Sequence, residues 1–447
     1  MFKRKITEQI HQWKVDYDGR SCLLIKGARR VGKTTVATEF AKNNYRSYAL
    51  IDFSHPSSNN IKRMIQDGFD DLDELFREIS RKYNITLHDR NSVIILDEVQ
   101  LFPLVRQLVK HLVADGRYDY IETGSSISLN SDSGILNPSE EHPIEMYPMD
   151  FEEFCWATGN DSTIPLIKGC FDSRTPLGRY AHESVLKLYR TYMLIGGMPA
   201  SISAFVQKNN YAASENAKKD IISLYENDSE KLVKGRNVRG RRLFNSIPIS
   251  LSNRNKVFKI ANLESGGKYR DYSDLIDAMN DSMMCNMCFN ITDLDRAYDM
   301  YVDDMQFKMY LCDTGLLFTQ SFKADKDKEN EIYDCMVCGD ISINEGMYFE
   351  NMVAQELRAR GYKLRCFTFY PKSSSTNLHE IDFIIPSSKG ISVVEVKSGK
   401  TSSKHASLDH FIEEHGDRVK EIFVIHSKDL RVDEDITYLP IYMTMFL

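Results

Sequence analysis

The sequence predicts an α/β fold whose first domain is built on a mainly parallel sheet, and three stretches carry that prediction. Residues 27–34, GARRVGKT, have the G-x-x-x-x-G-K-S/T spacing of a phosphate-binding loop and lie between an apolar run and a helix-compatible run. Residues 92–100 form an unbroken apolar run that ends in two carboxylates, which is typical of a parallel strand buried on both faces. Residues 118–126 resemble a further strand that ends in small hydroxyl side chains. Together they predict a nucleotide-binding core.

The phosphate-binding loop predicts the chemistry of its own residues. Gly27 and Gly32 let the backbone bend around a polyphosphate, so that N–H groups point at its oxygens with the positive end of the next helix behind them. Lys33 is expected to reach the β and γ phosphates, and Thr34 to offer its hydroxyl to Mg2+. The residues predicted to contact the nucleotide are Gly27, Arg29, Arg30, Val31, Gly32, Lys33, Thr34, Thr35 and Ser125.

Two carboxylates at the end of the apolar run complete the predicted site. Asp97 is expected to hold Mg2+, directly or through water, and Glu98 to orient or deprotonate the attacking water. Ser125 is a candidate for sensing the γ phosphate. The N-K-x-D motif with which GTPases read their base does not occur, which favours ATP. We therefore expect ATP and Mg2+ as ligands, with Lys33 and Glu98 as catalytic residues.

Length and composition limit the class of protein. The 447 residues suit about three domains. Because the net charge is -7, binding to nucleic acid would need a local basic patch. No apolar run approaches a membrane span, the first residues lack a signal-peptide core, and nine cysteines fit reduced thiols better than disulfides. These features predict a cytoplasmic protein with no membrane partner.

Two cysteine pairs have the C-x-x-C spacing of zinc sites: Cys285 with Cys288, and Cys335 with Cys338. The pairs are much further apart in sequence than in compact zinc ribbons. Core packing is therefore the favoured interpretation, and zinc binding is the alternative.

The middle of the chain predicts two further parts. Residues 156–230 lack strand alternation and are expected to form a helical lid beside the core. Residues 231–320 predict three helices and two strands, the order of a winged-helix domain, which can bind DNA or protein. Residues 231–242 carry six basic residues and no acid. This stretch is a candidate for binding DNA phosphates, for supplying an arginine to a neighbouring subunit's ATP, or for a solvated turn.

The last part of the chain, from 321 to 447, contains a second set of candidates. Glu395 and Lys397 are two residues apart and so share one face of a strand, while Asp382 can lie on the neighbouring strand. Asp382 and Glu395 are expected to bind Mg2+, and Lys397 to stabilise charge or position water. Glu350, on a predicted helix, could add a carboxylate. This pattern is short and common, so nuclease activity stays open.

Several short motifs follow one another in an order typical of one family. They are the phosphate-binding loop, LDEVQ at 96–100, TGS at 123–125, YPMDFEEF at 147–154, GGMP at 196–199 and FKMYLCDTGL at 307–316. In this respect the chain resembles the prokaryotic AAA+-like, additional-strand P-loop ATPases that carry a restriction-endonuclease-like C-terminal domain. Two departures are the Met and Cys-rich segment at 283–288 and Ile381-Asp382, which replaces the proline-aspartate pair of the PD-(D/E)XK nucleases.

The resemblance implies an ATP-binding core at 1–155, a helical lid at 156–230, a winged-helix-like domain at 231–320 and a nuclease-like domain at 321–447. Two functions follow as expectations. In the first, Mg2+-dependent ATP hydrolysis is coupled to DNA binding or processing. In the second, ATP operates a switch whose inactive nuclease-like domain binds a partner, either another protein or further copies of the chain.

Overall fold

The structure is a computed structural model that describes residues 1–68, 71–125, 138–233, 235–253, 256–264, 266–294, 298–322, 333, 337, 345–372, 377–387, 390–397 and 406–447. Its internal contacts divide nearly all of the chain into two compact units. The first spans Lys3–Tyr147, and the second spans Pro148–Asn280 and Met284–Leu447.

The first unit contains the parallel sheet that the sequence predicts. Its strands are β1 (Cys22–Lys26), β2 (Ser47–Asp52), β3 (Ser92–Asp97), β4 (Asp119–Gly124) and β5 (Glu141–Glu145), in the order β2-β3-β4-β1-β5. All four strand pairs are parallel, and β3 is buried along its whole length. The phosphate-binding loop follows the strand that lies between β4 and β5.

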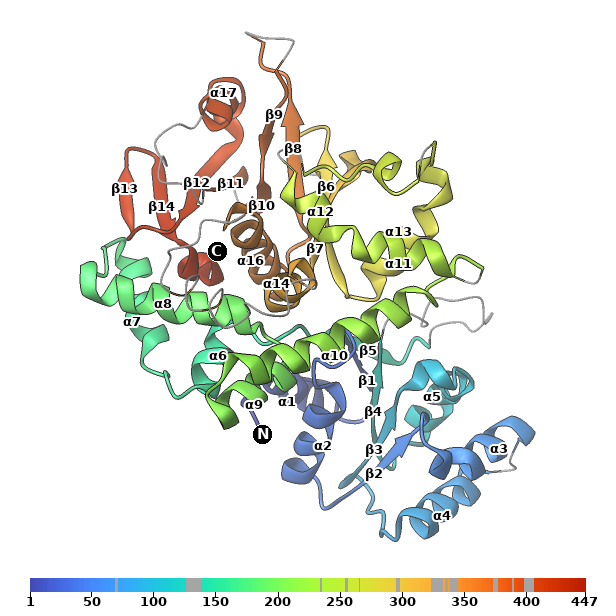
Figure 1. The fold of residues 1–447 in the computed structure, drawn as a ribbon. Coiled ribbons are helices and arrows are strands. Elements are labelled where there is room, and N and C mark those ends of the chain that lie inside the picture. The colour runs from blue at the N-terminus through green and yellow to red at the C-terminus, as the bar shows by residue number, and fades with distance from the viewer. Residues whose placement is uncertain are drawn as a thin grey trace. The chain divides into compact units, whose positions relative to one another are not determined.

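Helices cover both faces of this sheet (Figure 1). On one face lie α1 (Ile6–Tyr17) and α2 (Lys33–Asn44), and on the other lie α3 (Asn59–Asp67), α4 (Leu72–Tyr83) and α5 (Leu104–Asp115). Alternate residues of β2 and β3 face α3–α5, so that Ile51 and Leu96, with Tyr120 of β4, join one apolar core with these helices. The sheet is therefore packed on both sides, as a parallel sheet requires.

The second unit begins with helices, as predicted for residues 156–230. They are α6 (Phe151–Ala157), α7 (Thr163–Ser173), α8 (Arg179–Ile195), α9 (Pro199–Lys208) and α10 (Tyr211–Ser229). Their contacts group them with the C-terminal elements in the second unit. Their role as a lid over nucleotide stays a prediction.

The segment predicted as a winged helix supplies strands to a larger sheet. After α11 (Asn237–Asn245), α12 (Ile247–Ser252) and α13 (Ser273–Asp281) come β6 (Cys285–Ile291) and β7 (Val302–Leu311). Strand β6 pairs antiparallel with β7 and parallel with β8 (Arg365–Phe369), and β9 (His379–Ile381) pairs with β8. Residues on both sides of the predicted boundary at 320 thus share one sheet, and the winged-helix assignment stays a prediction.

A second sheet and the remaining helices complete this unit. Its strands are β10 (Phe383–Ser387), β11 (Gly390–Val396), β12 (Val419–His426), β13 (Arg431–Asp433) and β14 (Ile436–Pro440), in the order β10-β11-β12-β14-β13. The helices are α14 (Thr314–Ser321), α16 (Glu345–Ala359) and α17 (Ala406–His415). Apolar side chains of both sheets, such as Phe367 and Val393, belong to one buried core.

The GGMP and DTGL motifs meet inside the second unit and have a structural role there. A Cβ atom on Gly197 would lie 2.1 Å from the Met149 carbonyl oxygen, so no larger residue fits without a backbone shift. The Gly197 N–H donates to Asp313, whose other carboxylate oxygen accepts from Leu316 N–H and caps α14. The two motifs therefore stabilise the junction of α8, α9 and α14.

One buried histidine makes the stability of the second unit sensitive to acid. Burial, assisted by Arg431 and Lys428, lowers the pKa of His426 to about 4. The unfolded chain protonates this ring below about 6.5, so the folded state loses about 2 to 3 kcal/mol of stability between pH 7 and pH 4.5. We expect His426→Asn, which can still accept the hydrogen bond of Lys428 N–H, to lose that part of the pH dependence. Urea unfolding at the two pH values measures it, and parallel profiles for both proteins would contradict the assignment.

Candidate functional site

The phosphate-binding loop has the backbone that its glycines predict. Gly32 adopts φ +102° and Arg30 adopts φ +73°, both in the left-handed region. A Cβ atom on Gly27 would lie 2.4 Å from the Met146 carbonyl oxygen, so the loop passes directly against the chain after β5. The helix α2 begins at Lys33, which places its N-terminal N–H groups at the loop.

Lys33 is almost fully buried beneath this loop. Its Nζ donates to the carbonyl oxygens of Gly27 at 2.9 Å and of Ala28 at 3.0 Å. Burial lowers the pKa of Lys33 to about 8, although the nearby carboxylates of Glu98 and Asp97 act in the opposite direction. In the part of the chain that the structure describes, Nζ donates to neutral carbonyls alone, so this ammonium is well placed to gain from an anionic ligand.

Asp97 receives two hydroxyl hydrogen bonds at the end of β3. Thr34 Oγ1 donates to Asp97 Oδ1 at 2.7 Å, and Thr123 Oγ1 donates to the same oxygen. Burial raises the pKa of Asp97, and the two hydroxyls offset part of this effect. The oxygen atoms of Thr34 and Asp97 are of the kind that Mg2+ prefers, so the residues fit a Mg2+ site. No specific role is predicted for Thr123 from the sequence.

Glu98 follows directly and has an unusual backbone conformation. Its φ of +58° is rare for a residue with a side chain and is often found at functional sites. Gln100 Nε2 donates to Glu98 Oε2 and, at 3.0 Å, to Ser125 Oγ. The structure thus joins two predicted residues, Glu98 and Ser125, through a glutamine whose role we did not predict.

The remaining loop residues differ in exposure. Val31 is fully buried, whereas Arg29, Arg30 and Thr35 are exposed. Arg4 was not predicted at all: it is 7% exposed and donates to the carbonyl oxygens of Val31 at 2.8 Å and Tyr147 at 2.7 Å. This arginine therefore connects the loop to the chain after β5. Its position before α1 does not predict these contacts.

The C-terminal candidates also come together, around a lysine. Lys308, on β7, is 1% exposed, and its Nζ lies 3.0 Å from Glu350 Oε1 and 3.3 Å from Asp382 Oδ1. It also forms an ion pair with Glu380. Lys397 Nζ donates to Glu395 Oε1 at 2.6 Å, which confirms that these two side chains share a face. The sequence did not predict Lys308 as part of this group.

Every carboxylate of this cluster has a protein partner. Asp382 Oδ2 accepts from Val396 N–H at 2.9 Å, and Glu350 also accepts from Tyr310 and Lys256. Burial and the charge of Asp382 raise the pKa of Glu395 to about 8. Burial alone would raise the pKa of Glu350, but Lys308 and Lys256 lower it to about 2. Within the described residues, no group of three or more His, Cys, Asp or Glu side chains is arranged to hold a metal ion.

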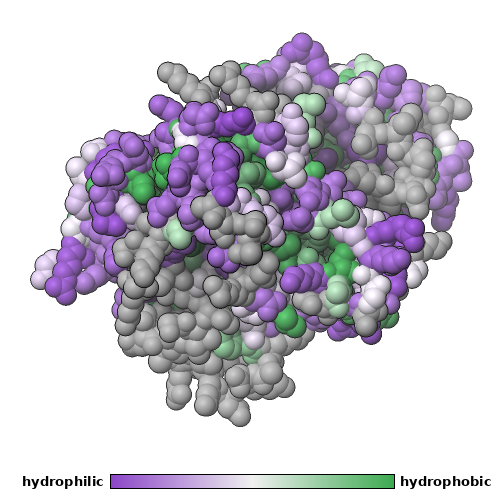
Figure 2. Space-filling model, turned by 90° about the horizontal axis from the view of Figure 1, so that it is seen from above, coloured by the Kyte–Doolittle hydropathy of each residue, from purple (hydrophilic) through white to green (hydrophobic). Residues whose placement is uncertain are grey.

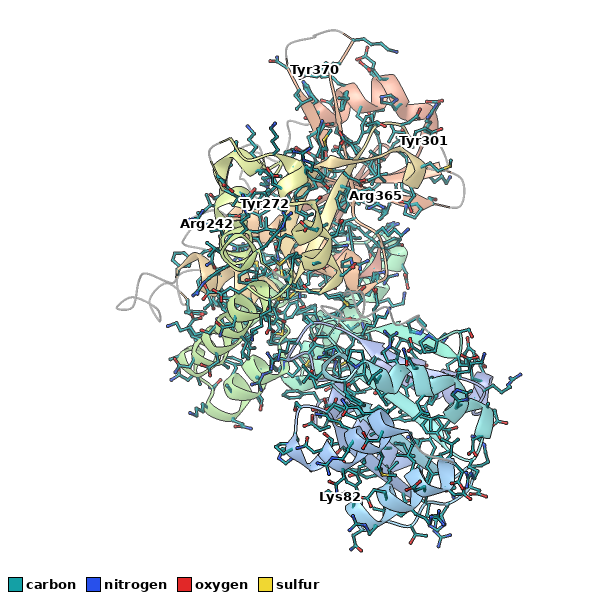
Figure 3. The ribbon with its side chains drawn as sticks, turned by 90° about the vertical axis from the view of Figure 1, so that its right-hand side faces the viewer. Lys82, Arg242, Tyr272, Tyr301, Arg365 and Tyr370 are labelled. Atoms are coloured by element: carbon teal, nitrogen blue, oxygen red, sulfur yellow. The ribbon has the colours of Figure 1, made fainter. Side chains whose placement is uncertain are left out.

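Three arginines of the basic stretch at 231–242 form ion pairs with acidic residues. Arg236 lies 3.2 Å from Asp274, Arg239 lies 3.1 Å from Glu264, and Arg241 lies 2.9 Å from Glu230. Arg242 is exposed and lies near Tyr272 (Figure 3). Lys234 is outside the described residues. The arginines thus have intramolecular partners, although exposed ion pairs of this kind are weak and can be exchanged.

The cysteine pairs give little support to zinc binding. Cys285 and Cys288 are both buried on β6, and because they are three residues apart on a strand they point to opposite faces. They cannot bind one ion together in this conformation. Cys335 and Cys338 lie outside the described residues.

Comparison with known families assigns the first unit. Residues 19–155 match the model of the AAA domain, and this match covers the phosphate-binding loop, both carboxylates and the full parallel sheet. This part of the chain is similar to AAA-type P-loop domains. Residues 186–327 and 345–444 match two domains of unknown function, DUF8612 and DUF4143. The match to the AAA domain thus covers most of the first unit, and the two matches to domains of unknown function lie almost wholly in the second.

The individual proteins to which this chain is similar have low sequence identity with it. An uncharacterized protein of Methanocaldococcus jannaschii is 23% identical over 374 residues, which cover 81% of this chain and 71% of that protein. A Walker-type ATPase of Pyrococcus abyssi aligns over 72% of this chain and 96% of its own, with 14% identity and a TM-score of 0.43. The Drosophila ORC bound to DNA aligns over 76% of this chain and 96% of its own, with 11% identity and a TM-score of 0.26. Because both TM-scores are below 0.5, the similarity of residues 19–155 to the AAA domain is argued from the family model alone.

The surface gives no sign of a membrane-spanning segment. Among the described residues, no helix is both long and apolar enough to cross a membrane. On the face drawn in Figure 2, hydrophilic side chains cover much of the coloured surface, and hydrophobic ones appear in small areas between them.

Proposed function

We propose that this protein binds and hydrolyses ATP in a Mg2+-dependent manner at the end of β1 and β3. The observation that carries the proposal is the group formed by Lys33, Thr34 and Asp97. It combines a buried ammonium, whose hydrogen-bond partners among the described residues are two carbonyl oxygens, with a hydroxyl and a carboxylate 2.7 Å apart. The match of residues 19–155 to the AAA domain supports the same function.

Each residue of the group has a separate task in this proposal. Lys33 exchanges its carbonyl partners for phosphate oxygens, and the N–H groups at the start of α2 bind the same phosphates. Thr34 and Asp97 hold Mg2+, which offsets the charge of the phosphates when it is bound. Glu98 orients the attacking water. Gln100 donates a hydrogen bond to Glu98 and another to Ser125, and so connects Glu98 to the residue that follows β4.

For the second unit, the contacts favour a nucleotide-controlled switch over a DNA-processing enzyme. Arg236, Arg239 and Arg241 of the basic stretch have carboxylate partners at 2.9 to 3.2 Å, and the net charge of the chain is -7. A phosphate backbone would have to displace those partners. In this version, ATP binding in the AAA domain changes how the second unit binds a protein partner or another copy of the chain. DNA binding that ATP strengthens, measured by fluorescence anisotropy, would instead favour the processing version.

Replacing Lys33 tests the proposed ATP site. We expect Lys33→Ala to weaken ATP binding about 10 to 150-fold, because charge-assisted hydrogen bonds contribute about 1.5 to 3 kcal/mol. A fluorescent ATP analogue measures binding, and phosphate release measures hydrolysis. Lys42→Ala is the matched control, since Lys42 lies on the same helix and is exposed beside Glu39. Hydrolysis by Lys33→Ala at the wild-type rate would rule out the assignment.

A further inference from the structure

Lys308 occupies the centre of the C-terminal carboxylate cluster, where a nuclease-like site would need a metal ion. Its Nζ has three carboxylate partners, which come from α16, β9 and the residue after β9. We propose that Lys308 is the resident cation of this cluster and that its ammonium closes the site to Mg2+. The inference does not depend on ATP binding in the other unit.

The geometry suits an ammonium group better than a divalent ion. An ammonium has three N–H donors, and Lys308 directs them to Glu350, Glu380 and Asp382. Mg2+ would require near-octahedral coordination by oxygen atoms at about 2.0 to 2.1 Å. A metal ion among the same carboxylates would also lie next to a positive charge that is only 1% exposed to solvent.

The other oxygens of the cluster are mostly in use as well. Glu350 has Tyr310 and Lys256 as further partners, and the second oxygen of Asp382 accepts the backbone N–H of Val396. Glu395 is different: Lys397 holds one of its oxygens, and the other is buried without a hydrogen-bond partner in the described part of the chain. If the ammonium of Lys308 were removed, Glu350, Glu380 and Asp382 would lose its charge, and together with the second oxygen of Glu395 they would be available to an incoming cation.

Lys308→Met tests this inference, because methionine keeps most of the apolar stem and removes only the charge. We expect full-length Lys308→Met, without nucleotide, to bind Mn2+ roughly a hundredfold or more tightly than wild type, since a cation about 4 Å from another is strongly repelled even inside a protein. Electron paramagnetic resonance of free Mn2+ gives the binding curve. Adding Asp382→Asn to Lys308→Met should remove the gained site, and Lys308→Arg should gain none.

The wild-type protein provides a test that does not depend on the folding of any variant at Lys308. If the inference is correct, the wild-type protein binds no Mn2+ at the carboxylate cluster, so Asp382→Asn leaves its Mn2+ binding unchanged. It also has no Mg2+-dependent plasmid cleavage that is lost in Lys397→Ala. Either activity in wild type would overturn it. A folded Lys308→Met protein that binds Mn2+ no better than wild type would also overturn it. Absence of both activities in wild type supports the inference even if Lys308→Met fails to fold.

Discussion

Glu98→Gln is expected to bind ATP normally and to hydrolyse it about 100 to 10,000 times more slowly, the range that general-base catalysis provides. Glutamine has nearly the shape of glutamate, and its amide oxygen can still accept the hydrogen bond from Gln100. It cannot accept a proton from water. The left-handed backbone at φ +58° stays the same, because it is set by the turn between β3 and the next helical turn rather than by the carboxylate.

Single-turnover hydrolysis, with protein in excess over ATP, separates the chemical step from product release. Glu98→Asp is the informative control, because it keeps the carboxylate but retracts it from Gln100, and it should hydrolyse ATP at an intermediate rate. If Glu98→Gln lost affinity for ATP in proportion to its rate, Glu98 would be a binding residue and not a base.

Arg106→Met should produce the largest loss of stability in the first unit, about 3 to 5 kcal/mol, as expected when one partner of a buried ion pair is removed. Arg106 and Glu141 form a two-pronged pair at 2.9 and 2.6 Å, and their side chains are only 4% and 6% exposed. Glu122 lies beside them, fully buried, and burial together with the charge of Glu141 raises its pKa well above the ordinary value. Without Arg106, two carboxyl groups would share one buried space with no cation.

Hydrogen exchange at the amides of β1 and β4 measures this loss locally, and urea unfolding measures it globally. The double variant Arg106→Met with Glu141→Leu should recover most of the stability, because it removes both charges and leaves apolar groups of similar size. Exchange rates in Arg106→Met equal to those of wild type would show that Glu141 finds another partner.

The parallel sheet could be predicted from sequence because its information is local. The loop at 27–34 and the apolar run of β3 each define their own element, and the strand-loop-helix order then places their ends at the same edge. Lys33, Thr34 and Asp97 come together for that reason alone. The pairing of Glu395 with Lys397 was predictable in the same way, from the two-residue period of a strand.

The missing parts of both sites depend on contacts between distant segments. Arg4 reaches Tyr147, and Lys256 reaches Glu350, across stretches whose packing no local pattern defines. Lys308 lies in the continuously buried second half of β7, and only the fold shows that it faces three acids. The basic stretch at 231–242 contains no acid, but the acids that pair with it come from α10, α13 and the segment near 264.

The sheet β7-β6-β8-β9 has a consequence for how this chain can have evolved. Two of its strands lie in the region that matches one domain of unknown function, and the other two lie in the region that matches the second. Loss of either region would turn β6 or β8 into an unpaired edge, which is an aggregation hazard. We therefore expect the two regions to be inherited together. The first unit has a sheet that is complete in itself, so we expect it to occur joined to other domains as well.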